Sequence, residues 1–269
     1  MRRQRNTKAF VTSSVLRPTS YVLLLTLLGC RVSLSPVKNR VGVGVESYVV
    51  FDADGENGEG DLYIGSASGG KAFRITFTRV HESSPALAPD GIMLAFIRGR
   101  HAADSAGYRI WVMNLLNGAE REVPALGEGD YPQRLAWSLD GTAIYVGTSR
   151  GVFRIPAPPA SPDPQRVAPN AISLADTILG VPLGNPVAAL ARECDGGVCA
   201  FTASGSQALS PTGRAPFRWG ADSVGYFEGE MIEVRPLGGG TVRQLTWTEA
   251  PVNIRTASHF PGVARAGSQ

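Results

Sequence analysis

Short apolar strands alternate with polar turns along most of the chain, and their order repeats. In the clearest unit, residues 84–123, a Pro-Asp-Gly turn is followed by apolar strands at 92–97 and 108–113. Asn117-Gly118 then marks a hairpin turn before a last edge strand at 119–123. The spacing therefore predicts a small antiparallel sheet built from one continuous stretch of sequence.

The same order of strands recurs on both sides of that unit. The next copy, 131–155, places an Asp-Gly turn 50 residues after the first one. Copies at 47–76 and 224–246 follow the same pattern, and residues 171–211 form a more degenerate copy. Because these strands are mostly apolar on both faces, a single unit is not stable alone, and neighbouring units must cover one another.

This repeat predicts an all-β fold, a β-propeller of four-stranded antiparallel blades. Five blades are recognisable, and we expect five or six in a domain that spans residues 46–262. Residues 250–262 are expected to supply the inner strand of the first unit and so close the ring. A two-sheet sandwich is the alternative, but it accounts less well for the recurring turns. The 32 glycines and 19 prolines also favour many turns and short strands.

The clearest unit also resembles a known repeat, that of TolB-type (WD-like) β-propellers. The residues that carry the likeness are Pro85-x-x-Ala88-Pro89-Asp90-Gly91, Leu94-Ala95-Phe96 and Ile110-Trp111-Val112-Met113-Asn114. The resemblance extends weakly over about residues 46–247. It implies an interaction platform in the bacterial cell envelope, with a protein partner as the first expectation. Because such propellers also resemble the gating domains of prolyl-oligopeptidase-type enzymes, one alternative is a subunit or remnant of such a hydrolase system, which would need a separate catalytic partner. The other alternative is a periplasmic sensor that binds a small molecule or Ca²⁺.

The N-terminus resembles a bacterial lipoprotein signal peptide. Five basic residues accompany an apolar run at 21–28, and Leu27-Leu28-Gly29-Cys30 resembles a lipobox. This predicts cleavage after residue 29, lipidation of Cys30, a tether at 30–45 and a C-terminal tail at 263–269. The apolar run is too short to span a bilayer, which needs roughly 20 residues. We therefore expect an extracytoplasmic protein that is attached through its N-terminal lipid only, on the periplasmic side, at the outer membrane or at the cell surface.

The charge of the chain argues against a nucleic-acid partner. The whole sequence carries +3, but its first 29 residues contain five basic residues and no acidic one, which leaves −2 for the rest. No basic cluster remains there that could bind a polyanion. The expected partner is an envelope protein or a small ligand, and the chain is expected to be a monomer.

The two remaining cysteines, Cys194 and Cys199, lie close together in the sequence. In an oxidising compartment we expect them to form a structural disulfide. If Gly196-Gly197 form a two-residue hairpin turn, the cysteines face each other as a non-hydrogen-bonded pair, with Cα atoms about 4.5 Å apart. Two free thiols or a redox pair are the alternatives, although the spacing differs from the C-x-x-C of redox sites.

The most acidic stretch is a weak candidate for a calcium site. The carboxylates that could bind Ca²⁺ are those of Asp52, Asp54, Glu56 and Asp61. Asn57 stands where an EF-hand loop needs glycine, and Tyr63 where it needs glutamate. We therefore interpret the stretch as a solvated loop between the second and third strands of the first blade. The sequence predicts no metal and no cofactor.

A hydrolase motif also occurs, in the wrong context. Gly147-x-Ser149-x-Gly151 matches the nucleophile elbow of α/β-hydrolases, which needs a strand before it and a helix after it. Here apolar strands at 144–146 and 152–155 flank the motif, so we expect a hairpin turn inside a blade. The histidines offer no contextual sign of a catalytic base. The sequence therefore predicts a non-catalytic binding protein.

Overall fold

The computed structural model divides the chain into two compact units, Met1–Ser33 and Leu34–Gln269. It describes residues 37–55, 58–99, 107–124, 126–127, 129–138, 140–158, 165–166, 181–183, 189–202, 205–220, 222–248, 251 and 253–263. The first unit, with the predicted signal peptide and Cys30, lies outside these residues. Within them, no helix is long and apolar enough to cross a membrane.

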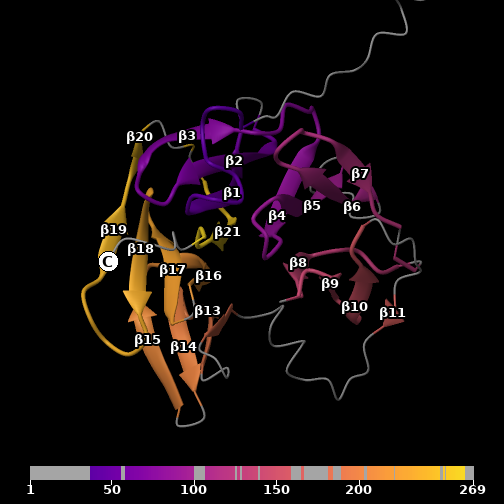
Figure 1. Cartoon of the computed structure of the whole chain (residues 1–269). Coiled ribbons are helices and arrows are strands. Elements are labelled where there is room, and N and C mark those ends of the chain that lie inside the picture. Colours follow the sequence, from indigo (N-terminus) through magenta and orange to yellow (C-terminus); the bar gives the residue numbers. More distant parts are fainter. Residues whose placement is uncertain are drawn as a thin grey trace, which may run out of the picture. The chain divides into compact units, whose positions relative to one another are not determined.

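The described strands of the second unit form five sheets, the blades of a β-propeller (Figure 1). From the axis outward, blade 1 contains β21 (Thr256–Phe260), β1 (Tyr48–Asp54), β2 (Gly60–Ser66), β3 (Gly70–Arg74) and β20 (Trp247–Thr248). Blade 2 contains β4 (His81–Leu87), β5 (Met93–Gly99), β6 (Arg109–Asn114) and β7 (Glu120–Glu122). Blade 3 contains β8 (Arg134–Trp137), β9 (Ala143–Thr148), β10 (Gly151–Pro156) and β11 (Gln165–Arg166).

Blade 4 contains β12 (Val181–Leu183), β13 (Ala189–Cys194), β14 (Gly197–Thr202) and β15 (Gly205–Ser210). Blade 5 contains β16 (Arg214–Trp219), β17 (Ser223–Glu228), β18 (Met231–Pro236) and β19 (Arg243–Leu245). The predicted all-β propeller of antiparallel blades is confirmed, with five blades among the described residues.

The two Asp-Gly turns of the repeat adopt the same local structure. In blade 2 the Asp90 carboxylate accepts a hydrogen bond from the Ile92 amide at 2.8 Å, and in blade 3 Asp140 accepts one from the Thr142 amide at 3.0 Å. The glycine that follows each aspartate has a positive φ, 64° in Gly91 and 70° in the other turn, which glycine adopts without steric cost. The turn signal thus sets the same connection from first to second strand in both blades.

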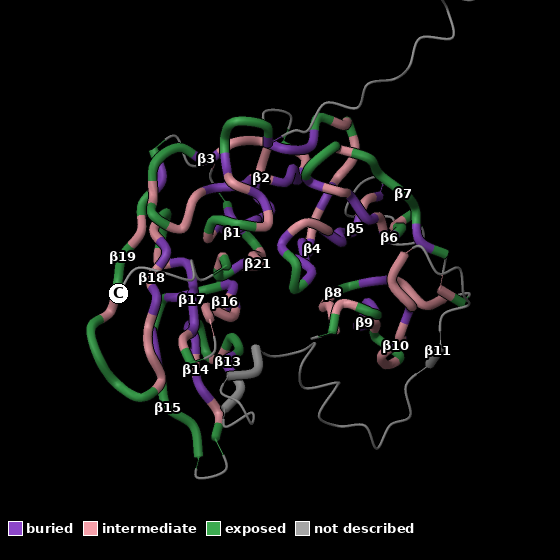
Figure 2. The backbone as a smooth tube through the Cα atoms, viewed as in Figure 1, coloured by how far each residue is buried: buried purple, intermediate pink, exposed green. Residues whose placement is uncertain are grey.

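Buried residues follow the middle strands of the blades (Figure 2), and their apolar side chains pack between neighbouring sheets. Four hydrophobic clusters of described residues lie between blades, with Val50 of blade 1 and Phe96 of blade 2 in one of them. The others join blade 1 to blade 5, blade 2 to blade 3, and blade 4 to blade 5. This is why strands with apolar residues on both faces predict a propeller, since each blade is stabilised by its neighbours.

The C-terminal segment closes the ring by pairing with both edges of blade 1. As predicted, it supplies the inner strand: β21 pairs antiparallel with β1, with Tyr48 opposite Phe260. The sequence did not predict that β20 also pairs, in parallel, with the outer strand β3. Trp247 in β20 is buried, stacks on Phe51 with ring centroids 4.7 Å apart, and donates a hydrogen bond to the Ser66 carbonyl at 2.9 Å.

Candidate functional site

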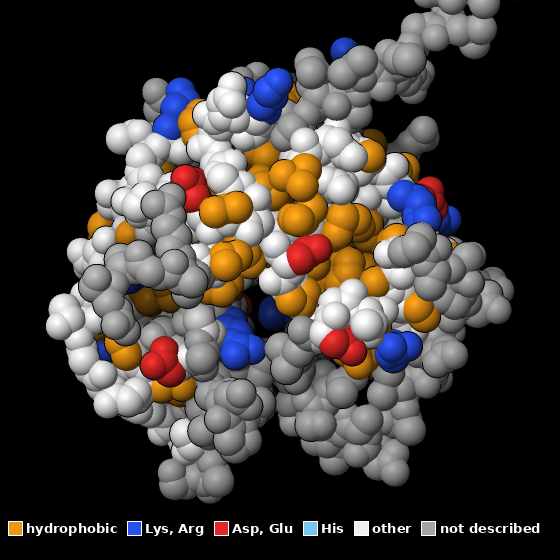
Figure 3. Space-filling view, viewed as in Figure 1, with side chains coloured by type: hydrophobic (Ala, Val, Ile, Leu, Met, Phe, Trp, Pro, Cys, Tyr) orange, Lys and Arg blue, Asp and Glu red, His pale blue; other side chains and the backbone are white. Residues whose placement is uncertain are grey.

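A cavity of about 600 Å³ lies between the inner strands of the blades. Its walls come from β4, β8, β16 and β21, together with Glu193 of β13. Figure 3 shows the hollow near the centre of one face, with Lys or Arg side chains beside it. Because these strands belong to different blades, the cavity depends on how the blades are arranged and not on any single blade.

Hydrogen bonds between blades align the inner strands around the cavity. The Leu87 amide of β4 donates to Ser258 Oγ of β21 at 3.0 Å. On the other side of β4, the Trp137 indole of β8 donates to the Ala86 carbonyl at 2.9 Å. Trp137 therefore connects blades 2 and 3 and also lines the cavity, so one side chain serves both packing and the site.

The cavity lining carries three arginines and one glutamate. Arg255 of the closing segment forms ion pairs with Asp54 and, at 3.9 Å, with Asp52. Glu193 Oε1 accepts a hydrogen bond from the Ala215 amide at 2.7 Å. The two other lining arginines, Arg134 and Arg218, have no carboxylate partner among the residues that the structure describes.

Asp52 is fully buried behind the cavity wall, on β1. Its carboxylate accepts hydrogen bonds from the Thr256 amide, at 2.9 Å, and from the Thr256 hydroxyl. Burial outweighs these bonds and the nearby Arg255, and raises the pKa of Asp52 to about 6. This carboxyl group therefore titrates near neutral pH and contacts the strand that closes the ring.

His259 of β21 lies in the cavity wall and stacks on Trp219, with ring centroids 3.9 Å apart and planes 9° apart. Its Nε2 is hydrogen-bonded to Ser47 Oγ at 2.9 Å. Burial, with the charge of Arg243 as a lesser cause, lowers the pKa of His259 to about 3, so the ring is neutral at physiological pH. Its Nδ1 has no hydrogen-bond partner in the described part of the chain, so this Ser–His pair lacks the group that orients a catalytic histidine.

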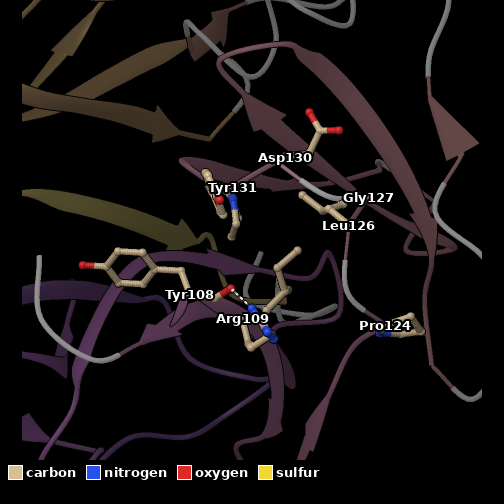
Figure 4. A pocket seen from close by; sticks show the side chains of 10 residues that line it. Tyr108, Arg109, Pro124, Leu126, Gly127, Asp130 and Tyr131 are labelled. Carbon is tan, nitrogen blue, oxygen red and sulfur yellow. Dashed lines mark hydrogen bonds between the residues drawn. The ribbon is translucent and has the colours of Figure 1, made fainter. Parts of the chain in front are cut away.

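A second, smaller cavity of about 230 Å³ lies between the start of β6 and the connection to β8. Figure 4 shows the Asp130 carboxylate pointing away from the Arg109 guanidinium. Arg109 donates to the Tyr108 carbonyl at 3.0 Å and lies 3.7 Å from Glu122. Since the polar groups do not converge, this cavity is the weaker candidate.

The structure separates the residues of the weak calcium candidate. Asp61 pairs with Ala53 across the β1–β2 hairpin and so lies on the opposite sheet face from Asp52 and Asp54. Arg74 binds Asp61 at 2.8 Å, while Asp54 binds Arg255 and Asn253. Glu56 lies outside the described residues. Among the described residues, no group of three or more His, Cys, Asp or Glu side chains could hold a metal ion.

Cys194 and Cys199 form the predicted disulfide, but the predicted register is wrong. The turn residues are Asp195 and Gly196, so Cys194 pairs with Gly197, and Cys199 lies diagonally across with a Cα–Cα distance of 5.9 Å. Asp195 and Gly196 both have positive φ, as Asp-Gly hairpin turns require. A Cβ on Gly197 would lie 2.1 Å from a backbone oxygen of β15, so this glycine is needed for close packing and not for the turn.

The hydrolase motif forms a hairpin, as expected. Ser149 and Arg150 are the turn between β9 and β10, which pair antiparallel from Thr148 opposite Gly151 onward. His81 accepts a hydrogen bond from the Gly60 amide at 3.0 Å and belongs to another blade. The strand–turn–helix arrangement of a nucleophile elbow is therefore not formed by these residues.

The sequence did not identify the arginines of the central cavity. Arg134 is the first residue of β8, Arg218 is the penultimate residue of β16, and Arg255 precedes β21. The only signal in the sequence is that each of these arginines lies in or beside an inner strand. Finding them as a group requires knowing which strand of every blade faces the axis.

No protein-family model matches the sequence, and no curated protein is similar to it. Solved structures similar to the chain include TolB from Acinetobacter baumannii, with 14% identity, 93% of this chain and 74% of that chain covered, and a TM-score of 0.43. A nidogen/laminin complex has 10% identity, coverages of 79% and 98%, and a TM-score of 0.43. A TolB from Agrobacterium tumefaciens has 14% identity, coverages of 80% and 74%, and a TM-score of 0.39. The neighbours thus include TolB proteins, the propellers that the repeat resembles, while the blade topology itself establishes the fold.

Proposed function

We propose that this chain is a non-catalytic, lipid-anchored β-propeller of the bacterial cell envelope, which binds a ligand or a partner protein in its central cavity. The lipobox-like residues up to Cys30 support the anchor. The Cys194–Cys199 disulfide supports an extracytoplasmic location, because disulfides persist in oxidising compartments.

The observation that carries the binding role is the central cavity. Its volume of about 600 Å³ falls within the range of about 300 to 1,000 Å³ that is typical of ligand sites. Its lining combines aromatic and aliphatic side chains, such as Trp137 and Phe217, with a few charged groups. Sites of this composition bind and orient molecules. Among the described residues, the histidines and serines there do not form a catalytic set of a nucleophile, a base and a group that orients the base.

The binding role is tested by filling the cavity. Ala136 lies in its wall, so Ala136→Trp places a large side chain in the space, while Glu230→Trp adds the same side chain at an exposed turn between β17 and β18. We expect envelope components that are captured by the wild-type protein to be lost with Ala136→Trp and kept with Glu230→Trp. Equal capture by both variants would contradict binding in the cavity.

The lipid anchor needs a separate test in cells. Labelling with a palmitate analogue is expected to mark the wild-type protein and to leave Cys30→Ala unmarked. The variant should also move from the membrane fraction to the aqueous fraction, because no second anchor is proposed. Wild-type protein without label would contradict the anchor and leave the binding role to be judged by the cavity variants.

A further inference from the structure

The central cavity contains positive charge that the protein itself does not neutralise. Its charged lining residues are Arg134, Glu193, Arg218 and Arg255. Arg255 is neutralised by Asp54, and the buried Asp52 lies behind it. With Arg255 neutralised, the guanidinium groups of Arg134 and Arg218 stand against one lining carboxylate, that of Glu193, which leaves one excess positive charge in the lining.

Two of these arginines offer unused hydrogen-bond donors. Arg134 is exposed, and its guanidinium makes no hydrogen bond or ion pair with any residue that the structure describes. Arg218 is half-buried, and its Nε donates to the Gly220 carbonyl at 2.7 Å, a neutral acceptor that leaves the charge of the guanidinium uncompensated. A guanidinium group with free N–H donors binds carboxylate or phosphate oxygens through bidentate hydrogen bonds.

The two arginines reach the cavity from different sides and at different depths. Arg134 begins β8, and the carbonyl of its neighbour Gln133 accepts a hydrogen bond from Ser84 Oγ, in the middle of β4. Arg218 lies near the end of β16, next to Trp219, which stacks on His259 near the end of β21. Because the inner strands run alongside one another, Arg134 at the start of β8 and Arg218 near the end of β16 lie toward opposite ends of the space.

Apolar side chains cover the wall between those ends. Leu87, Trp137 and Phe217 all line the cavity from separate blades. A molecule that lies along the axis would therefore meet a positive group at either end and apolar surface in between. The volume of about 600 Å³ accommodates a small molecule.

We infer that the central cavity binds a small, elongated organic anion with carboxylate or phosphate groups at both ends, one bound by Arg134 and the other by Arg218. The inference rests on the proposed binding function and names the chemical class of its ligand. The middle of the ligand lies against Trp137 and Phe217.

Calorimetric titration of the folded protein tests the charge requirement with three probes. Suberate carries two carboxylates, fructose bisphosphate carries two phosphates, and octanediol has the length of suberate without charge. We expect suberate, fructose bisphosphate or both to bind, with an affinity that falls as salt is added, and octanediol not to bind. Binding of suberate alone identifies carboxylate as the recognised group, and binding of fructose bisphosphate alone identifies phosphate.

Arginine variants test the placement. Arg134→Gln and Arg218→Gln are each expected to weaken anion binding by about tenfold or more, the usual effect of losing a charge-assisted hydrogen bond. Arg214→Gln is the matched control, because Arg214 lies on the same β16 strand but outside the cavity lining, and its guanidinium donates to the Gly229 carbonyl. Far-UV circular dichroism and the melting temperature establish that each variant is folded.

Several results would overturn the inference. They are the absence of anion binding at millimolar concentration, equal binding of octanediol, and unchanged affinity in both Arg134→Gln and Arg218→Gln. If Ala136→Trp loses the capture of envelope components and no anion binds, only the inference about the anion is overturned. The proposed binding function would then still stand. Anion binding together with equal capture by Ala136→Trp and Glu230→Trp would instead count against capture of partners in the cavity.

Discussion

Two titratable side chains, the buried Asp52 beside β21 and the half-buried His259 within β21, contribute to stability with opposite pH dependence. Asp52 has a pKa of about 6 in the fold, above its ordinary value near 3.8, because it is buried. His259 has a pKa of about 3, below its ordinary 6.5, for the same reason. Burial disfavours the charged form of each group, which is the deprotonated form of Asp52 and the protonated form of His259.

Replacing Asp52 by asparagine should remove a gain in stability on acidification. The folded state binds the Asp52 proton more tightly than the unfolded state, so this residue stabilises the fold as the pH falls from 7 through 6. Between pH 7 and pH 5 the contribution is about 1 kcal/mol. Urea unfolding at both pH values should show that Asp52→Asn lacks this increment relative to the wild type. An identical pH response of the two proteins would show that Asp52 has an ordinary pKa.

Replacing His259 by phenylalanine should have the opposite effect on the pH response. The unfolded state binds the His259 proton more tightly, so this residue destabilises the fold as the pH falls below 6.5, by about 2 kcal/mol at pH 5. His259→Phe keeps a ring against Trp219 but cannot titrate. Its free energy of unfolding should therefore fall less than that of the wild type between pH 7 and pH 5. A larger fall in the variant would contradict the buried, neutral histidine.

At the scale of single elements, the short strand β20 has a larger effect than its two residues suggest. Trp247 stacks on Phe51 and is hydrogen-bonded to the Ser66 carbonyl, so it fastens the outer edge of blade 1. Trp247→Ala should lower the free energy of unfolding by about 3 to 5 kcal/mol, as expected when a buried tryptophan is truncated. Leu116→Ala is the control, because Leu116 is 54% exposed and its truncation should change little. Equal small effects in guanidinium unfolding would show that β20 does not stabilise the blade.

The cysteine hairpin gives a second prediction at this scale. The disulfide closes a very short loop at the tip of β13 and β14, so its entropic contribution is about 2 kcal/mol. A Cys194→Ser, Cys199→Ser double variant should lose that amount in urea unfolding. A thiol reductant should destabilise the wild type by the same amount and leave the double variant unchanged. Sensitivity of the double variant to the reductant would contradict this assignment.

The elements that could be predicted from sequence are those whose signals are local. The Asp90-Gly91 turn and the apolar run after it locate the start of β5 within one residue and its end within two, because turn chemistry and burial act on adjacent positions. In the cysteine hairpin two glycines follow an aspartate, and local preference alone allows two registers. The observed register is chosen by packing, because Gly197 must approach the backbone of β15. β20 had no local signal, since its pairing with β3 joins residues far apart in the chain.

At the scale of the whole molecule, the central cavity could not be assembled from the sequence. Arg134 and Arg218 come from different blades, and each looks like an ordinary charged residue beside an apolar strand. Only the arrangement of the blades brings them to one space, and that arrangement includes the pairing of β21 with β1. Ring closure and the binding site are therefore one structural property, and loss of the first should remove the second.

Removal of the C-terminal segment tests this dependence directly. A chain shortened after residue 246 lacks β20 and β21 and so exposes both edges of blade 1. The free energy of unfolding should fall by more than about 5 kcal/mol. The buried side chains of Trp247 and Phe260 each contribute about 3 to 5 kcal/mol to it. That is comparable to the whole stability of an ordinary domain. We therefore expect fast amide hydrogen exchange in β1 and no cooperative unfolding transition, whereas a chain that lacks only residues 264–269 should behave as the wild type.

A synthetic peptide of residues 247–263 should restore the stability of the shortened chain, because β20 and β21 are held on blade 1 by non-covalent contacts. Binding to the folded state alone makes the restored stability rise with peptide concentration. A peptide with Trp247→Ala should restore less at the same concentration, since it lacks the stacking on Phe51. Slow exchange in β1 of the shortened chain without any peptide would show that the ring closes by other contacts, and the cavity would then not depend on the C-terminal strands.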